Sequence, residues 1–193
     1  MPDTVTNNKA NVSAGKPKIT GAIYRAPLGT TLPTTATETL NAAFKAMGYV
    51  SADGLTNANS ASTSNIKAWG GDTVLVTQSD KTDTLAFTLL EVLSKDVLSA
   101  VHGGANVTGT LTDGIAVEVN ADLQEEAIWV IDMIMRGNVA KRIVAPDAVI
   151  SAMADVVYKD DEAVGYGVTL TCLPDDDGNT HYEYIKGPST PTT

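Results

Sequence analysis

The sequence predicts a mainly β protein, an antiparallel β-sandwich or barrel with one or two short flanking α-helices. Apolar and polar residues alternate with a period of two along much of the chain, as they do in strands that bury one face. The strand-like runs are joined by turns and not by long helices, which favours hairpins over parallel βαβ units. We expect one domain over 19–186, between an extended N-terminal arm at 1–18 and a polar tail at 187–193.

The first third of the chain is predicted to hold an extended arm, a short helix and a long loop. Residues 1–18 are polar and unpatterned, which indicates an arm that is mobile until a partner orders it. Segment 38–47, ETLNAAFKAM, has apolar residues at helical spacing and stops at Gly48, which predicts a short helix. Segment 50–68 is polar and too long for a simple turn. We therefore expect a long loop that a partner orders.

Two elements are predicted in the middle of the chain. Runs 73–78 and 84–92 flank the polar SDKTD segment and predict a hairpin that turns at 79–83. Segment 94–102 starts with Ser94 as a potential N-cap and stops before two glycines, which predicts a helix.

The last third holds the clearest strand signals. Runs 128–136 and 140–150 flank Gly137-Asn138, a tight-turn dipeptide, and so predict a hairpin over 128–150. Segment 164–172, VGYGVTLTC, alternates strictly and predicts a strand with its apolar side chains on one face. We expect it to pair with 181–185 across the turn PDDDGN.

Composition and charge exclude several classes of protein. The chain has no apolar run near the ~20 residues of a membrane-spanning helix and no signal-peptide pattern, so we expect it to be made and kept in a cytoplasm. A single cysteine, Cys172, excludes an intrachain disulfide. The net charge of −10 is uneven, with +3 in residues 1–50 and −13 in the rest. So acidic a body repels nucleic acid, because phosphate binding needs lysine and arginine.

No catalytic or cofactor motif is recognisable. His102 and His181 are the only histidines, and neither belongs to a recognisable hydrolase, zinc-protease, P-loop or dinucleotide-binding pattern. The run Asp175 to Asn179 looks superficially like a calcium loop, but it lacks the spacing of an EF-hand and reads better as a turn, with weak calcium binding left open. We expect no enzyme activity, no cofactor and no dedicated metal site.

A series of short segments follows in order over roughly 20–185. They are APLGTTLPT (26–34), GYVSADGLT (48–56), KAWGGDTV (67–74), FTLLEVLSKDVL (87–98), NVTG (106–109), KRIVAPDA (141–148), YKDDEAVGYGVTLT (158–171) and PDDDGNTHYEYI (174–185). Together these segments resemble the tail tube protein, or major tail protein, of long-tailed siphovirus-type bacteriophages, and their serial arrangement makes the resemblance specific.

The resemblance implies a structural virion protein. Six subunits would form a ring, and rings would stack into a tube whose inner strands close a β-barrel around a channel for DNA. The implied partners are further copies of the chain, the tape measure protein in the lumen, and tail terminator and distal tail or baseplate proteins at the ends. DNA would pass without specific binding. We expect no immunoglobulin-like domain after residue 185 and favour a non-contractile tail, assembled in the bacterial cytoplasm.

Candidate residues follow from combining the resemblance with the strand pattern. Hairpins near 72–92 and 128–150 are expected to line the channel. The lumen candidates are Asp72, Asp80, Asp83, Glu91 and Asp132. The candidates for contacts between subunits or rings are Val12, Lys16, Lys18, Leu55 and Trp69. The alternative is a capsid decoration protein or another β-sandwich structural or adhesion module.

Overall fold

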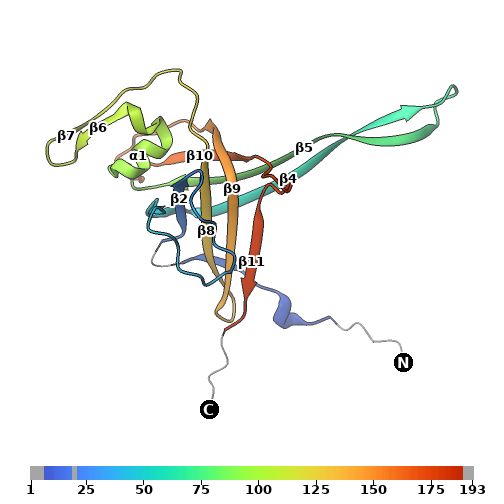
Figure 1. The fold of residues 1–193 in the computed structure, drawn as a ribbon, viewed down its shortest axis with the longest axis horizontal. Coiled ribbons are helices and arrows are strands. Elements are labelled where there is room, and N and C mark those ends of the chain that lie inside the picture. The colour runs from blue at the N-terminus through green and yellow to red at the C-terminus, as the bar shows by residue number, and fades with distance from the viewer. Residues whose placement is uncertain (1–6, 19–20, 189–193) are drawn as a thin grey trace, which may run out of the picture.

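The computed structural model describes residues 7–18 and 21–188, and one twisted antiparallel sheet dominates them (Figure 1). Along the main path of this sheet the strand order is β3-β2-β8-β9-β10-β5-β4, with β1 added to β8 and β11 added to β9. Its strands are β1 (Gly15–Pro17), β2 (Ile23–Pro27), β3 (Lys45–Ala46), β4 (Val50–Lys67), β5 (Thr73–Leu89), β8 (Ala127–Met135), β9 (Val139–Met153), β10 (Tyr166–Cys172) and β11 (Tyr182–Lys186).

The remaining elements lie together at one end of the body (Figure 1), apart from a 3-10 turn near the N-terminus, Lys9–Asn11. Helix α1 (Lys95–His102) is followed by a 3-10 turn (Gly104–Asn106) and a small hairpin of β6 (Val107–Thr110) and β7 (Gly114–Val117). The mainly β fold is confirmed, with α1 as the one α-helix of the described residues. The predicted helix at 94–102 is confirmed too, and α1 buries Val97, Leu98, Ala100 and Val101.

The hairpin of β8 and β9 forms the centre of the body. Gly137 and Asn138 both have positive φ, at 78° and 59°, a backbone that glycine and asparagine adopt more readily than other residues and that reverses the chain here. The predicted hairpin over 128–150 is therefore confirmed. Strand β9 is 15 residues long and pairs with β8 on one side. On its other side it pairs first with β11 and then with β10.

The core has two parts, one on each face of this hairpin. The larger cluster packs β8 and β9 against β5, β10 and α1, and in it Phe87 and Trp129 lie with ring centroids 5.9 Å apart. The smaller cluster holds Phe44, Ile128 and Val144 under segment 28–44. Because β8 is covered on both faces, its residues 127–132 are all buried.

The strand predicted at 164–172 is confirmed, whereas its partner was predicted incorrectly. The apolar side chains of Val168, Leu170 and Cys172 are buried, as the alternation indicates. β10 pairs with β5 and β9, and β11 pairs with β9 but not with β10. The length of β9 explains the difference, because it offers one edge to both strands in succession.

The predicted loop at 50–68 and the predicted turn at 79–83 are both wrong. Segment 50–68 is not a loop, because β4 occupies Val50–Lys67. No turn interrupts 79–83, because β5 runs through it and pairs with β4 from Leu89 to Thr73. The turn lies instead at 68–72, where the Gly71 amide donates to the carbonyl of Ala68.

The predicted helix at 38–47 is also absent. The buried Arg142 side chain donates hydrogen bonds to the carbonyls of Thr35 and Glu38, which holds this segment against the sheet. Its end forms the short strand β3, paired with β2. Tertiary contacts thus outweigh the local helical spacing.

The N-terminal arm is partly ordered by its own chain. Residues 15–17 form β1 and pair with β8. Residues 1–6 of the predicted arm and 189–193 of the predicted tail lie outside the described residues.

Candidate assembly interface

A long two-stranded hairpin projects from the body (Figure 1). Residues 56–67 of β4 and 73–82 of β5 are all exposed, and we call 56–82 the projecting hairpin. At ~3.3 Å per residue its β4 side is about 40 Å long. Its two strands are hydrogen-bonded to each other, and within the described residues no further strand of the sheet pairs with them over that length.

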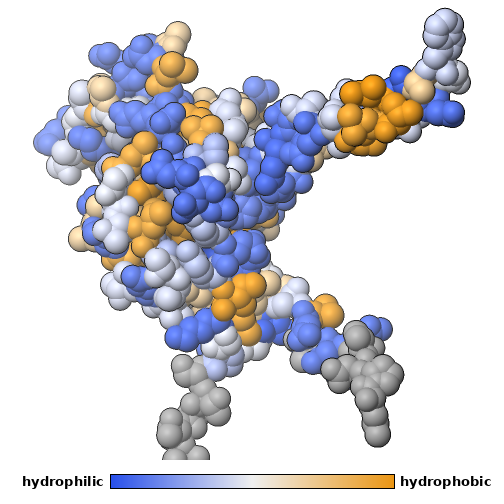
Figure 2. Space-filling model, turned by 45° about the vertical axis from the view of Figure 1, so that its right-hand side comes forward, coloured by the Kyte–Doolittle hydropathy of each residue, from blue (hydrophilic) through white to orange (hydrophobic). Residues whose placement is uncertain are grey.

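Apolar side chains gather near the end of the projecting hairpin (Figure 2). We call them the hairpin patch: Ile66, Trp69, Val74, Leu75 and Val76. Each is at least half exposed, and the Trp69 side chain is fully accessible. Successive side chains of a strand point to opposite faces, so Val74, Leu75 and Val76 place apolar atoms on both faces of the hairpin. Exposed apolar surface of this kind marks a site of protein association.

The root of the projecting hairpin is clamped by a buried carboxylate. Asp83 is 1% exposed, and its Oδ2 accepts the Thr180 hydroxyl and contacts Nδ1 of His181. The other ring nitrogen of His181 lies 3.5 Å from the side-chain amide of Asn57 on β4. The segment before β11 therefore ties down both strands where they leave the body.

The acidic turn 175–179 supports this clamp from outside. Oδ1 of Asp175 accepts the backbone amides of Asp177 and Asn179, and Oδ2 accepts the Tyr182 hydroxyl at 2.6 Å. The hydrogen bond from Tyr182, with those from the backbone amides, lowers the pKa of Asp175. Its carboxylate is thus engaged in shaping the turn, as the turn interpretation requires.

A buried ion pair lies under segment 28–44. The Arg142 guanidinium donates to both carboxylate oxygens of Asp132, at 2.6 and 2.8 Å, and Lys18 lies 3.5 Å from the same carboxylate. Nη1 of Arg142 also donates to two backbone carbonyls, so the guanidinium makes four hydrogen bonds inside the chain. This pair is a structural connection inside the chain.

The lumen candidates separate by burial. Asp83 and Asp132 are buried, and their carboxylates are held by the contacts within the chain described above. Asp72 and Asp80 are exposed on the projecting hairpin or its turn. Glu91 is exposed at the other end of β5, where it accepts the Tyr49 amide.

The contact candidates also fall into two groups. Val12, Lys16 and Lys18 are exposed along the N-terminal segment that runs beside β8. Trp69 lies in the turn of the projecting hairpin. Leu55 is half-buried and packs against the larger core cluster, so it anchors the root of β4.

Apart from Trp69, the residues of the hairpin patch are not among the predicted contact residues. Alternation marks a strand with one buried face, and the run Val74-Leu75-Val76 does not alternate. An unbroken apolar run beside a polar strand was the available signal, because a two-stranded hairpin with no core has no reason to be apolar on both faces.

Other kinds of site find no support in the described part of the chain. Over residues 7–18 and 21–188, no three His, Cys, Asp or Glu side chains come together as a metal site. None of the helices in those ranges is long and apolar enough to cross a membrane.

Comparison with known proteins and protein families identifies the family of this chain. No curated protein matches it. A family model described as "Phage tail tube protein" matches residues 5–192, nearly the whole sequence. Together with the mainly β fold, this match shows that the chain belongs to the phage tail tube protein family and is a structural component of the phage tail.

Proposed function

We propose that six copies of this chain form a ring and that rings stack into the tube that conducts phage DNA from capsid to host. The observation that carries the proposal is the projecting hairpin, about 40 Å of paired strand that has no core of its own and ends in an apolar patch. A lone two-stranded hairpin is marginal in water. Contact with a neighbouring copy would bury the patch and stabilise the strands.

The sheet edge supports the same proposal. β4 is the last strand of the sheet, so its outer backbone groups have no neighbouring strand among the described residues. Open edges of this length promote association between chains, and a closed ring satisfies them without uncontrolled aggregation.

The charge supports passage of DNA without binding. A ring of six chains at −10 each carries about −60. Phosphates are held by lysine and arginine, so a wall rich in carboxylates gives DNA few contacts. Asp72, Asp80 and Glu91 are the exposed lumen candidates.

The finer parts of the proposal follow from the family. The tape measure protein would occupy the lumen during assembly, and terminator and distal tail or baseplate proteins would cap the ends. We also propose a siphovirus-type, non-contractile tail that is assembled in the host cytoplasm.

Negative-stain electron microscopy of the concentrated, purified chain tests the proposal. We expect tubes with a central channel built from six-fold rings. Protein that stays monomeric at high concentration would refute the proposal, and closed oligomers without a channel would favour the capsid decoration alternative.

A further inference from the structure

The β8–β9 hairpin carries a basic group at its turn. Arg136 lies in that turn. Lys16 of β1 lies opposite Ile134 near the end of β8, and Lys186 of β11 lies opposite Ala140 at the start of β9. Three strands thus bring lysine and arginine to one end of the body. We call it the basic end: Lys16, Lys18, Arg136, Lys141 and Lys186.

The other end of the same hairpin is acidic. Segment 118–126 leads into β8 and contains Glu118, Asp122, Glu125 and Glu126 with no lysine or arginine. Segment 154–165 follows β9 and adds Asp155, Asp160, Asp161 and Glu162 against the single basic residue Lys159. We call these two segments the acidic end.

The two ends are too far apart to neutralise each other. β8 has nine residues, so they are separated by roughly 25–30 Å. This exceeds the ~8 Å over which salt screens charges in physiological solution. Ion pairs within the chain cancel only part of the charge, namely Arg25–Glu125, Lys141–Glu183 and Lys159–Glu162. In the described residues, Lys16, Arg136, Asp160 and Asp161 form no ion pair.

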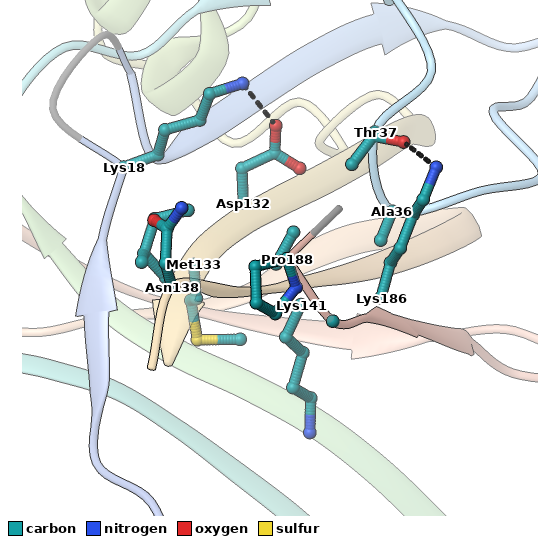
Figure 3. A pocket seen from close by; sticks show the side chains of 12 residues that line it. Lys18, Ala36, Thr37, Asp132, Met133, Asn138, Lys141, Lys186 and Pro188 are labelled. Carbon is teal, nitrogen blue, oxygen red and sulfur yellow. Dashed lines mark hydrogen bonds and ion pairs between the residues drawn. The ribbon is translucent and has the colours of Figure 1, made fainter. Parts of the chain in front are cut away.

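A cleft of about 370 Å³ opens at the basic end (Figure 3). Lys18 and Lys186 line it, and their ammonium groups contact Asp132 at 3.5 Å and the Thr37 hydroxyl at 3.3 Å. Asp132 is already held by two shorter hydrogen bonds from Arg142, and Thr37 is uncharged. The two lysines therefore retain donors for a carboxylate from outside the chain.

We propose that the basic end of one copy binds the acidic end of the next copy, with Asp160 and Asp161 entering the lysine cleft. This inference rests on the proposed function and adds which surfaces meet between rings. The contact joins two different surfaces of identical chains, so it repeats in one direction without closing. It makes the stack polar, with every subunit facing the same way.

Two charge-reversal variants test the contact. Arg136→Glu with Lys186→Glu reverses two of the five positive charges at the basic end, and Asp160→Lys with Asp161→Lys reverses two of the eight negative charges at the acidic end. Each variant alone would place like charges opposite each other where its reversed residues meet the unaltered end of the next copy. We expect the concentration needed for tube formation to rise at least ~10-fold, because like-charge juxtaposition costs several kcal/mol.

Mixing the two variants gives the decisive result. In an alternating stack the reversed residues of one variant meet the oppositely charged reversed residues of the other, so an equimolar mixture should assemble at a concentration at which neither component does. Sedimentation at low salt should show heterodimers of the two variants even below the concentration for tubes. Adding ~0.5 M salt should weaken both effects.

A matched control distinguishes the effect of losing this contact from the effect of changing the net charge. Asp176→Lys with Asp177→Lys makes the same charge change as the acidic-end variant, away from both ends. The hydrogen bonds described for the turn 175–179 use the Asp175 side chain and not these two, so this control should assemble like the wild type. If both end variants form tubes at the same concentration as the wild type, this inference is overturned and the proposed function still stands. Absence of wild-type tubes would refute the proposed function, and heterodimers of the variants would still be measurable.

Discussion

The two long hairpins of this chain have similar backbones and opposite surroundings. β8–β9 is buried on both faces and carries the core, whereas the outer part of β4–β5 is exposed on both faces. Trp129 on β8 is 1% exposed and Trp69, in the turn of the projecting hairpin, is fully accessible. Backbone hydrogen bonds alone are enough to form a long hairpin. Whether the hairpin stabilises its own chain or is available to bind a second chain depends on what packs against its faces.

Register illustrates the same difference. The central hairpin has one irregularity, near Ala127, and its buried side chains penalise any slip because a shift of one residue exposes the whole core face. The β4–β5 ladder has three irregularities, two of them in its exposed part, at Ser62/Thr63 and Ile66/Lys67. Faces that no core covers leave the register weakly specified, which suits a hairpin that adjusts to a neighbouring copy.

Replacing each tryptophan by alanine gives the largest expected contrast. Trp129→Ala should lower the free energy of unfolding by about 3–5 kcal/mol, because it leaves a cavity in the larger core cluster. Trp69→Ala should change it by less than ~0.5 kcal/mol, because the side chain touches little in the single chain. Urea unfolding of the unassembled chains measures both. Equal losses would contradict the contrast between the two hairpins.

Removing the buried carboxylate at the root should have an intermediate effect. Asp83→Ala deletes the acceptor of Thr180 and His181, and we expect a loss of about 1–3 kcal/mol, the cost of unpaired buried polar groups. Faster amide hydrogen exchange should appear in β4 and β5 near Asn57, while β8 stays protected. Asp80→Ala, an exposed carboxylate three residues away, is the matched control.

Cysteine chemistry tests the burial of β10. Burial, with a smaller contribution from Asp83, raises the pKa of Cys172 to about 12. At pH 8 the folded thiol should resist a disulfide reagent that labels it at once in denaturant, and a cysteine placed in the hairpin patch by Leu75→Cys should react rapidly. The folded thiol stays protonated while the unfolded one ionises near pH 9, so stability should fall as pH rises from about 9 toward 12. Fast labelling of native Cys172 would show that β10 is open.

The smallest effect on stability is expected in the hairpin patch. Leu75→Asp should leave the unfolding free energy of the single chain within ~0.5 kcal/mol of wild type. It should still abolish tube formation, because a charge would then lie in a buried contact between copies. Electron microscopy and urea unfolding together decide the outcome. Normal tubes from this variant would remove the patch from the proposed interface.

Several features could be predicted because their signals are local. The turn dipeptide Gly137-Asn138 and the alternation after Val164 specify the β8–β9 hairpin and β10 from neighbouring residues alone. The glycines after His102 mark the end of helix α1, and Ser94 occupies its N-cap position, although the Ser94 side chain makes no capping hydrogen bond. The serial order of short segments was enough to indicate the family that the family model then confirmed.

What remained hidden depends on residues far apart in the chain. Segment 50–67 is too polar to look like a strand, and it becomes one because β5 supplies hydrogen-bond partners along its length. The sequence suggests that Asp83 lies on the surface, but Thr180 and His181 cover it. Segment 38–47 has helical spacing, but Arg142 binds the carbonyl of Glu38 at its start. Local sequence therefore determines turns and alternating strands, whereas tertiary contacts decide pairing and burial, because both depend on groups that meet only once the chain has folded.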